Sequence, residues 1–178
     1  MLSGGRGRRL GGVDKGSLEV GGKRLIDRVL GALAVARRIV VVGPPLKVST
    51  EVLWTSEEPA DGGPVAGLAA GLTLVEEGIV VVVAVDMPFV TQSLVTRLVA
   101  ATVEVDGAIL RNGGDQYLCG AYTVEALRAR LRSLKAIRGA SMRRLLEGLR
   151  LERIKDPAAS WDCDTWEQVE GARSQEGG

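Results

Sequence analysis

Seven consecutive apolar residues, IVVVVAV at positions 79–85, constrain the fold more strongly than any other feature of the sequence. Five of the seven are valine, and β-branched residues favour β-strands. A strand without a polar face must be covered on both sides. The run therefore predicts a central strand in a sheet that has helices packed on both faces.

Short β-branched runs alternate with longer amphipathic stretches along the rest of the chain. Such alternation is typical of βα units on a mostly parallel sheet. Strands are predicted at 39–43, 51–55, 79–85, 107–110, 118–122 and 151–154, and helices at 24–35, 64–76, 91–101, 125–135, 141–149 and from 165. We expect a three-layer α/β/α sandwich with a mixed, mostly parallel sheet. It forms one domain over residues 1–173, and a frayed tail follows at 174–178.

The composition excludes several functional classes. The chain of 178 residues has 23 Lys and Arg against 22 Asp and Glu, so no overall field favours nucleic acid or a membrane. It has no histidine, which excludes histidine-based catalysis. Its apolar runs are shorter than the about 20 residues that cross a bilayer, and residues 1–9 lack the apolar segment of a signal peptide. We expect a cytoplasmic protein. Its two cysteines, Cys119 and Cys163, are expected to be inert core thiols, with reactive thiols as the alternative.

The glycine-rich segment LSGGRGRRLGGVDK, residues 2–15, is the first candidate ligand site. Its glycines let backbone N–H groups approach an anion, and its three arginines and one lysine offset phosphate charge. It is not a Walker loop, because Gly12 is followed by Val13 and Asp14. It is not a dinucleotide fingerprint either, because Leu10 stands in place of the third glycine. By composition alone the segment fits a polyphosphate site about as well as a flexible basic tail.

Two acidic positions offer candidate metal ligands. Asp86 directly follows the apolar run, and ligands of open α/β sheets bind at the carboxyl ends of strands. Its carboxylate suits Mg²⁺, and the alternative is that it caps the helix near Thr91. Asp162 and Asp164 are spaced to face the same side of an extended segment. The alternative there is that Asp164 or Thr165 caps the last helix.

Together these segments resemble the nucleotidyltransferases that act on molybdopterin. The N-terminal loop is similar to their LAGGxSxRMGxxK signature, and GGPVAGLAAGL (62–72), VDMPFV (85–90) and WDCDTWEQV (161–169) follow in the family's order. A weaker match is GASMRRLLEGL (139–149). The resemblance implies a Rossmann-like nucleotidyltransferase fold and Mg-dependent transfer of a nucleotidyl group. Gly4 stands where members that use GTP have glycine and members that use CTP have alanine, which implies GTP.

The resemblance also implies a mechanism. Lys15 would contact the triphosphate with Arg9 bracing it, and Asp86 and Asp164 would hold Mg²⁺. An acceptor phosphate oxygen would attack the α-phosphorus and expel pyrophosphate, which needs no general base because the phosphate is already ionised. The chain departs from the family at Asp162 and Asp164, where relatives usually carry asparagine. This departure leaves the acceptor open.

On the nucleoside side, the resemblance implies that main-chain groups recognise the base and ribose. The residues concerned are Leu2, Ser3, Gly4 and Gly5. Upstream of the second motif, Glu58 would take the place of an aspartate that contacts the nucleotide.

The acceptor half of the site is less clear from the sequence. Polar residues fall where relatives have a loop and strand facing the acceptor, although loop polarity explains them equally well: Asn112, Asp115, Gln116 and Tyr122. A second set of arginines is expected to lie on solvated helix faces: Arg128, Arg130, Arg132, Arg143 and Arg144.

Several alternatives stay open. The chain could use CTP or another nucleotide with a different phosphorylated acceptor, or be a non-catalytic nucleotide-binding partner of molybdoenzymes. A third alternative is an RNA-binding N-terminal arm. It is disfavoured because the chain has only two tyrosines and one phenylalanine on which bases could stack. The expected substrates are GTP and molybdopterin, with molybdoenzymes or other cofactor-biosynthesis proteins as protein partners. We expect a monomer or weak homo-oligomer that binds neither nucleic acid nor membrane.

The strand expected before the glycine-rich loop is nearly absent from the sequence. Such a loop normally follows a strand, and only Met1 and Leu2 precede it. We therefore expect the natural protein to begin some residues upstream.

Overall fold

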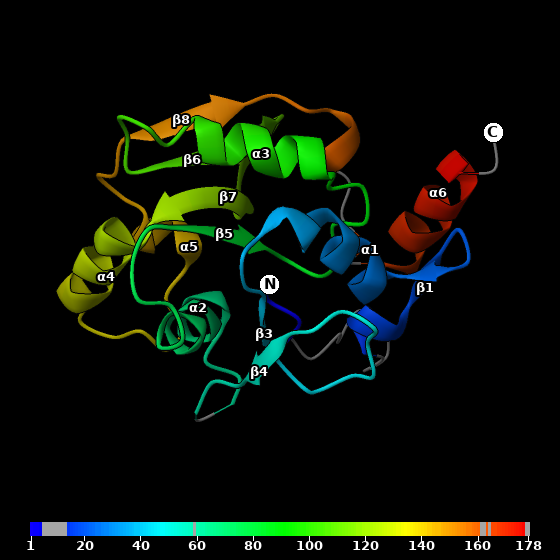
Figure 1. Ribbon diagram of the computed structural model, residues 1–178, viewed down its shortest axis with the longest axis horizontal. Helices are drawn as coiled ribbons and strands as arrows, with labels where there is room; N and C mark the ends of the chain where they lie inside the picture. Colours follow the sequence, from blue (N-terminus) through cyan, green and yellow to red (C-terminus); the bar gives the residue numbers. More distant parts are fainter. Residues whose placement is uncertain (5–13, 59, 161–162, 164, 177–178) are drawn as a thin grey trace.

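The computed structural model describes residues 1–4, 14–58, 60–160, 163 and 165–176 (Figure 1). Its N-terminus lies in the middle of the molecule, between β3 (Val40–Val42) and β5 (Ile79–Val83). Leu2 forms parallel bridges with Val42 on one side and with Ala84 on the other. The first three residues therefore join two groups of strands.

The two groups of strands form one mixed sheet around this N-terminal segment. In the first group, β3 pairs in parallel with β4 (Leu53–Thr55). The second group has the order β5, β7 (Gly114–Thr123), β6 (Gly107–Asn112), β8 (Leu151–Ile154). Because β7 alone among these strands runs antiparallel to its neighbours, the sheet is mostly parallel, as predicted.

Helices cover both faces of the sheet. One face carries α1 (Leu25–Ala32), the 3₁₀ helix η3 (Leu33–Val35) and α3 (Gln92–Ala100); the other carries α2 (Pro64–Leu72), α4 (Val124–Ser133) and α5 (Met142–Leu145). Successive side chains of β6 enter the two cores in turn. Ala108 and Leu110 pack with α1 and α3, and Ile109 packs with α2 and α4. This alternation confirms the predicted three-layer α/β/α sandwich.

The C-terminal part of the chain adds η4 (Ala158–Ser160) and α6 (Trp166–Glu176). The helix α6 packs Val169 and Ala172 into the core beneath α1 and α3. It continues to Glu176, into the segment where the sequence predicts a tail. In the described part of the chain, no helix has the combination of length and apolar character needed to cross a membrane. Cys119 and Cys163 are both buried, as predicted.

A small hairpin follows the glycine-rich segment, where the sequence predicts only a loop. After η2 (Lys15–Ser17), β1 (Glu19–Val20) and β2 (Lys23–Arg24) pair antiparallel. The two residues between them, Gly21 and Gly22, have φ of 56° and 70°. Two successive positive φ angles are the requirement of a tight hairpin turn, and glycine meets it without steric cost.

Candidate active site

The carboxyl ends of three adjacent strands meet at one edge of the sheet. Ser3 and Gly4 continue the N-terminal segment, Gly43 follows β3, and Asp86 lies shortly after β5. Ligands of open α/β sheets bind at this edge. The fold therefore brings three residues of two separate motifs, together with Gly43, to the position where a ligand site is expected.

Lys15 and Asp86 are in direct contact at this edge. Nζ of Lys15 donates to Oδ2 of Asp86 at 2.7 Å, and the two side chains are 17% and 18% exposed. Lys15 is positioned by η2, whose N-cap Asp14 accepts a hydrogen bond from the Gly16 amide at 2.9 Å. Two of the predicted catalytic residues, distant in sequence, thus form one largely buried ion pair.

Asp86 does not cap the helix that follows it. The N-cap of α3 is Thr91, whose hydroxyl accepts from the Leu94 amide at 3.1 Å. The main-chain oxygen of Asp86 instead accepts a hydrogen bond from the Cys163 amide at 2.9 Å. The capping alternative is therefore wrong for Asp86, and the C-terminal acidic motif reaches the same edge through Cys163.

A capping box starts α6. The Thr165 hydroxyl accepts from the Gln168 amide at 3.3 Å, and Gln168 Oε1 accepts from the Thr165 amide at 2.9 Å. Thr165 thus performs the capping role that the sequence left open between it and Asp164. Asp164 itself lies outside the described residues, as do Gly5 and Arg9.

Ser3 places a buried hydroxyl at the site. Ser3 is 6% exposed, and its Oγ is the one buried side-chain polar atom in the described part of the chain that has no hydrogen-bond partner. Burying an unpaired hydroxyl is unfavourable. A methyl group added to Gly16 would lie 3.4 Å from this Oγ, so η2 packs close to Ser3. The family resemblance implied only main-chain contacts for Ser3, and no pattern in the sequence singled out its side chain.

The start of α2 approaches the same edge from the other face of the sheet. A Cβ added to Gly67 would lie 3.5 Å from Leu2 Cδ2 and 3.6 Å from Glu57 Oε2. The other carboxylate oxygen of Glu57 accepts from the Gly62 amide at 3.0 Å. Glu58, to which the resemblance gave a nucleotide contact, is exposed and lines a cavity of about 380 Å³ beside α2. Glu57 is thus the acidic residue that folds against the loop leading into α2. The sequence could not distinguish Glu57 from Glu58, because a loop has no periodic pattern of buried and exposed residues.

Two of the four residues considered for the acceptor half, Asp115 and Tyr122, are engaged with other parts of the protein. Asp115 binds Arg153 at 3.1 Å and lies 3.8 Å from Arg111. Tyr122 is fully buried and donates its hydroxyl to the Tyr117 carbonyl at 2.8 Å, and its burial raises its pKa well above the ordinary value. Tyr122 is therefore a core residue and has no surface with which to face an acceptor.

Two of the helical arginines do not lie on solvated faces. Arg128 donates to the carbonyls of Val75 and Glu76, both at 2.6 Å, and Arg130 donates to the Leu145 carbonyl at 2.9 Å. Both are half-buried, because their guanidinium groups reach the unpaired carbonyls that follow or end neighbouring helices. The prediction of exposure is confirmed for the remaining three, Arg132, Arg143 and Arg144.

The described residues contain no group of three or more acidic or cysteine side chains arranged to hold a metal ion. The single carboxylate of Asp86 remains as a possible ligand. Mg²⁺ in nucleotide sites is commonly bound by one or two carboxylates together with substrate phosphates and water. A single carboxylate at this edge, which Lys15 contacts in the free protein, fits a cation that is shared with a nucleotide better than a self-contained metal centre.

The chain is similar in sequence to one protein family and to several of its members. Residues 1–154 match the family model described as the MobA-like NTP transferase domain. The chain is 32% identical over 120 residues to a molybdenum cofactor guanylyltransferase of Pseudomonas entomophila, covering 64% of the chain and 63% of that protein. It is 34% identical over 140 residues to a probable molybdenum cofactor guanylyltransferase of Pelotomaculum thermopropionicum, covering 76% of the chain and 68% of the relative. The chain thus spans less than two thirds of the length of the Pseudomonas relative.

The fold is similar to a solved structure from Archaeoglobus fulgidus, described as molybdopterin-guanine dinucleotide biosynthesis protein A. The TM-score is 0.76, and the superposition covers 99% of the chain and 96% of the other protein. The sequences are 23% identical, so this likeness supports the fold alone.

Proposed function

Because the chain belongs to the MobA-like NTP transferase domain family, we propose that it transfers GMP from GTP to molybdopterin and releases pyrophosphate. The product would be the guanine dinucleotide form of the molybdenum cofactor. The names of the Pseudomonas and Pelotomaculum relatives support this choice of nucleotide and acceptor. Gly4, at the position that distinguishes GTP from CTP in the family signature, agrees with it.

The contact between Lys15 and Asp86 is the observation that carries the proposal. It joins a cation and a carboxylate at the strand edge where three motif segments converge. Without a ligand the two charges neutralise each other. A triphosphate would recruit the Lys15 ammonium and so free the Asp86 carboxylate to bind a cation.

The reaction follows from these groups. An oxygen of the acceptor phosphate attacks the α-phosphorus of GTP as the bond to the pyrophosphate oxygen breaks. Lys15, braced by Arg9, offsets the charge that gathers on the leaving pyrophosphate. Asp86, with Asp164, would hold Mg²⁺, which when bound supplies further neutralisation of the phosphate charge. The acceptor phosphate is already ionised near neutral pH, so a chain without histidine can perform the step.

The direct test is an assay of pyrophosphate release with GTP, CTP, ATP and UTP, each with molybdopterin and Mg²⁺. Of the four nucleotides, we expect only GTP to support release, and we expect a product whose mass equals that of molybdopterin plus GMP minus one water. A preference for CTP, or a GTP-dependent product with another acceptor, would favour a different member of this enzyme class. Tight GTP binding with no turnover would instead support a non-catalytic nucleotide-binding partner.

Asp86→Asn tests the role of the site. The substitution keeps the shape of the side chain and removes its charge, so we expect kcat/KM to fall by about 100-fold or more, as for other electrostatic groups of active sites. Asp27→Asn is the matched control, because Asp27 also forms a 2.7 Å ion pair, with Arg24, away from the strand edge. Full activity in Asp86→Asn would contradict the proposed mechanism.

A further inference from the structure

The helix α2 has an apolar surface on every side. Its nine residues, PVAGLAAGL, include no polar side chain, whereas α3 and α4 each expose an arginine to solvent, Arg97 and Arg132. A helix that is apolar all round is typical of a position in which every side is covered. The composition of α2 therefore indicates that its outer side is covered as well as its inner side.

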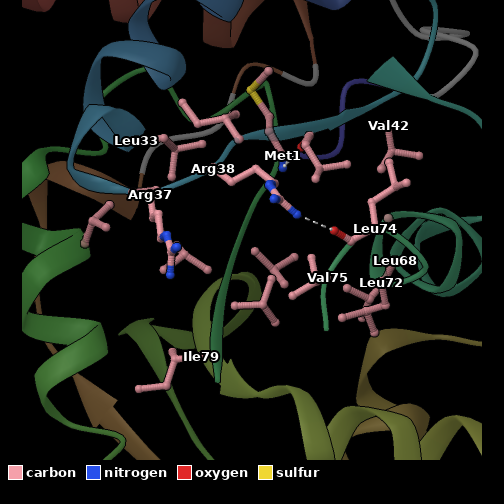
Figure 2. Close-up of a pocket in the computed structure, with 18 of the residues that line it drawn as sticks. Met1, Leu33, Arg37, Arg38, Val42, Leu68, Leu72, Leu74, Val75 and Ile79 are labelled. Carbon is pink, nitrogen blue, oxygen red and sulfur yellow. Dashed lines mark hydrogen bonds between the residues drawn. The ribbon is translucent and has the colours of Figure 1, made fainter. Parts of the chain in front are cut away.

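The sheet covers one side of α2. Leu68 and Leu72 are each 4% exposed, and Figure 2 shows both on the side of the helix that lines the cavity between β3 and β5. Ala66, Ala69 and Ala70 are half-buried and lie, by their helical spacing, on the opposite side. These three alanines line the cavity of about 380 Å³ beside α2, which we call the α2 groove.

Two loops form the flanks of the α2 groove. Glu58, which follows β4, lies on one flank, and Ile137 and Arg138, from the loop between α4 and α5, lie on the other. Figure 1 shows β4 and α4 on opposite sides of α2. The second loop is fixed in place by the Gly139 amide, which donates to the Gly62 carbonyl at 2.7 Å. The groove therefore has a negative charge on one flank and a positive charge on the other.

The side chains on both flanks are available for further contacts. Ile137 is 37% exposed and extends the apolar surface of the alanines. Glu58 and Arg138 are exposed, and in the described part of the chain neither of them forms an ion pair. An apolar surface with a charged rim is the usual arrangement of a protein–protein interface.

We propose that the α2 groove is the interface of a homodimer, in which α2 packs against α2 of a second copy around a two-fold axis parallel to both helices. Such an axis sets each flank of the groove against the opposite flank of the second copy. Arg138 then faces the partner's Glu58, and Glu58 faces the partner's Arg138. Ile137 of each copy contacts the apolar side of the other α2, so that the centre of the interface is apolar and its rim is charged.

Charge complementarity selects a second copy as the occupant. The groove carries one charge of each sign on opposite flanks, so it is complementary to itself. A nucleic acid or a uniformly acidic protein would be repelled by the flank that carries Glu58. The net charge of the chain is only +1, so two copies do not repel each other at long range.

The orientation of the axis also places the two candidate active sites. The helix α2 begins beside the active-site edge of the sheet, so an axis parallel to α2 brings both sites to the same end of the dimer. The inference concerns assembly and does not depend on the proposed reaction.

Sedimentation equilibrium of the chain tests the dimer. A helix of nine residues is about 13 Å long and forms a small interface, so we expect a reversible monomer–dimer equilibrium at about 10–100 µM protein. Ala69→Arg places a charge at the centre of the groove and should raise the dissociation constant about 10-fold or more. Ala129→Arg adds the same side chain at an exposed position of α4 and should change it less than about twofold. A chain that stays monomeric up to about 1 mM, or equal effects of the two substitutions, would overturn the proposal.

Exchange of the flanking charges tests the two-fold arrangement. Arg138→Glu and Glu58→Arg each set like charges against each other at both contacts of the dimer, so each should weaken dimerisation about 10-fold. An equimolar mixture of the two variants should dimerise as the unmodified chain does, because both contacts of the mixed dimer again join opposite charges. If the mixture stays as weak as the separate variants, the two copies do not associate through the α2 groove.

Discussion

At the scale of single residues, the polar groups of the candidate site differ in whether they have a partner in the free protein. The ion pair satisfies both of its charges at 2.7 Å. The Ser3 hydroxyl is buried and has no partner. A group left unpaired at a candidate ligand site is one whose hydrogen bond a ligand can complete.

Ser3→Ala should therefore leave the folded protein as stable or more stable, by up to about 1 kcal/mol in the free energy of unfolding, because an unpaired buried hydroxyl is removed. It should raise KM for GTP about fivefold with kcat unchanged, the value of one net hydrogen bond to the nucleotide. Urea unfolding and steady-state kinetics measure the two effects, with the exposed Ser17→Ala as control. A loss of more than about 1 kcal/mol would mean that the hydroxyl already has a partner in the free protein.

At the scale of elements, Arg128 connects two helices that lie side by side on one face of the sheet. It extends from α4 and donates to three carbonyls at the end of α2 and beyond it, those of Leu72, Val75 and Glu76. These carbonyls lack partners within a helix, and a cation near them also interacts favourably with the helix dipole.

Arg128→Gln should lower the free energy of unfolding by about 1–3 kcal/mol, since charged hydrogen bonds are lost and the carbonyl of the half-buried Val75 is left unpaired. Arg132→Gln on the same helix removes the same charge from an exposed position and should change stability by less than about 0.5 kcal/mol. Thermal or urea unfolding of the two variants gives the comparison. Equal effects would show that net charge, and not the contact with α2, is responsible.

Gly43 limits how closely β3 and the N-terminal segment approach each other at the active-site edge. Its φ is 145°, and a Cβ there would lie 2.8 Å from the Gly4 amide nitrogen and 2.9 Å from the Ser3 carbonyl carbon. Both are backbone atoms, so they cannot move aside as a flexible side chain does.

Gly43→Ala should destabilise the protein by about 1–3 kcal/mol and should lower nucleotidyl transfer further than this loss of stability explains, because Ser3 and Gly4 are displaced. The assay is run well below the Tm of the variant so that the folded fraction is constant. Gly114→Ala is the control, since a Cβ at Gly114 meets no atom within 4 Å. Full activity in Gly43→Ala would show that nucleotidyl transfer does not require the close approach of Gly43 to Ser3 and Gly4.

The sequence pattern predicted some elements and site residues and missed others, for physical reasons. The position of Asp86 followed from the apolar run before it, because burial of a strand fixes where its end lies. The β1–β2 hairpin was missed, because glycines spaced through a loop also serve a tight turn, and two-residue strands have no periodicity. The choice between Glu57 and Glu58 required the hydrogen bond to Gly62, which depends on how the loop folds against α2. The exposure of the first half of β5 depends on which strand lies beside it in the sheet, and the local sequence pattern does not determine that neighbour.

At the scale of the whole molecule, three N-terminal residues hold the two groups of strands together. The hydrogen bonds of Met1, Leu2 and Ser3 to β3 and β5 are the connection between these groups in the described residues. The stability of the entire sheet is therefore coupled to the state of the Met1 amino group, which lies inside this connection.

This coupling predicts a pH dependence for the chain that begins at Met1. Burial lowers the pKa of the amino group to about 5, against about 8 in the unfolded chain. Between these values the unfolded state binds a proton that the folded state does not, so the free energy of unfolding falls as the pH falls from 8 to 5. The slope approaches about 1.4 kcal/mol per pH unit and vanishes below the folded pKa.

Urea unfolding between pH 5.5 and 8 measures this slope with little interference, because the chain has no histidine and ordinary carboxylates titrate at lower pH. Acetylation of the amino group removes the titrating proton and should flatten the profile. A steep slope that survives acetylation would assign the titration to another group, and a flat profile in the unmodified chain would show that the Met1 amine is not buried.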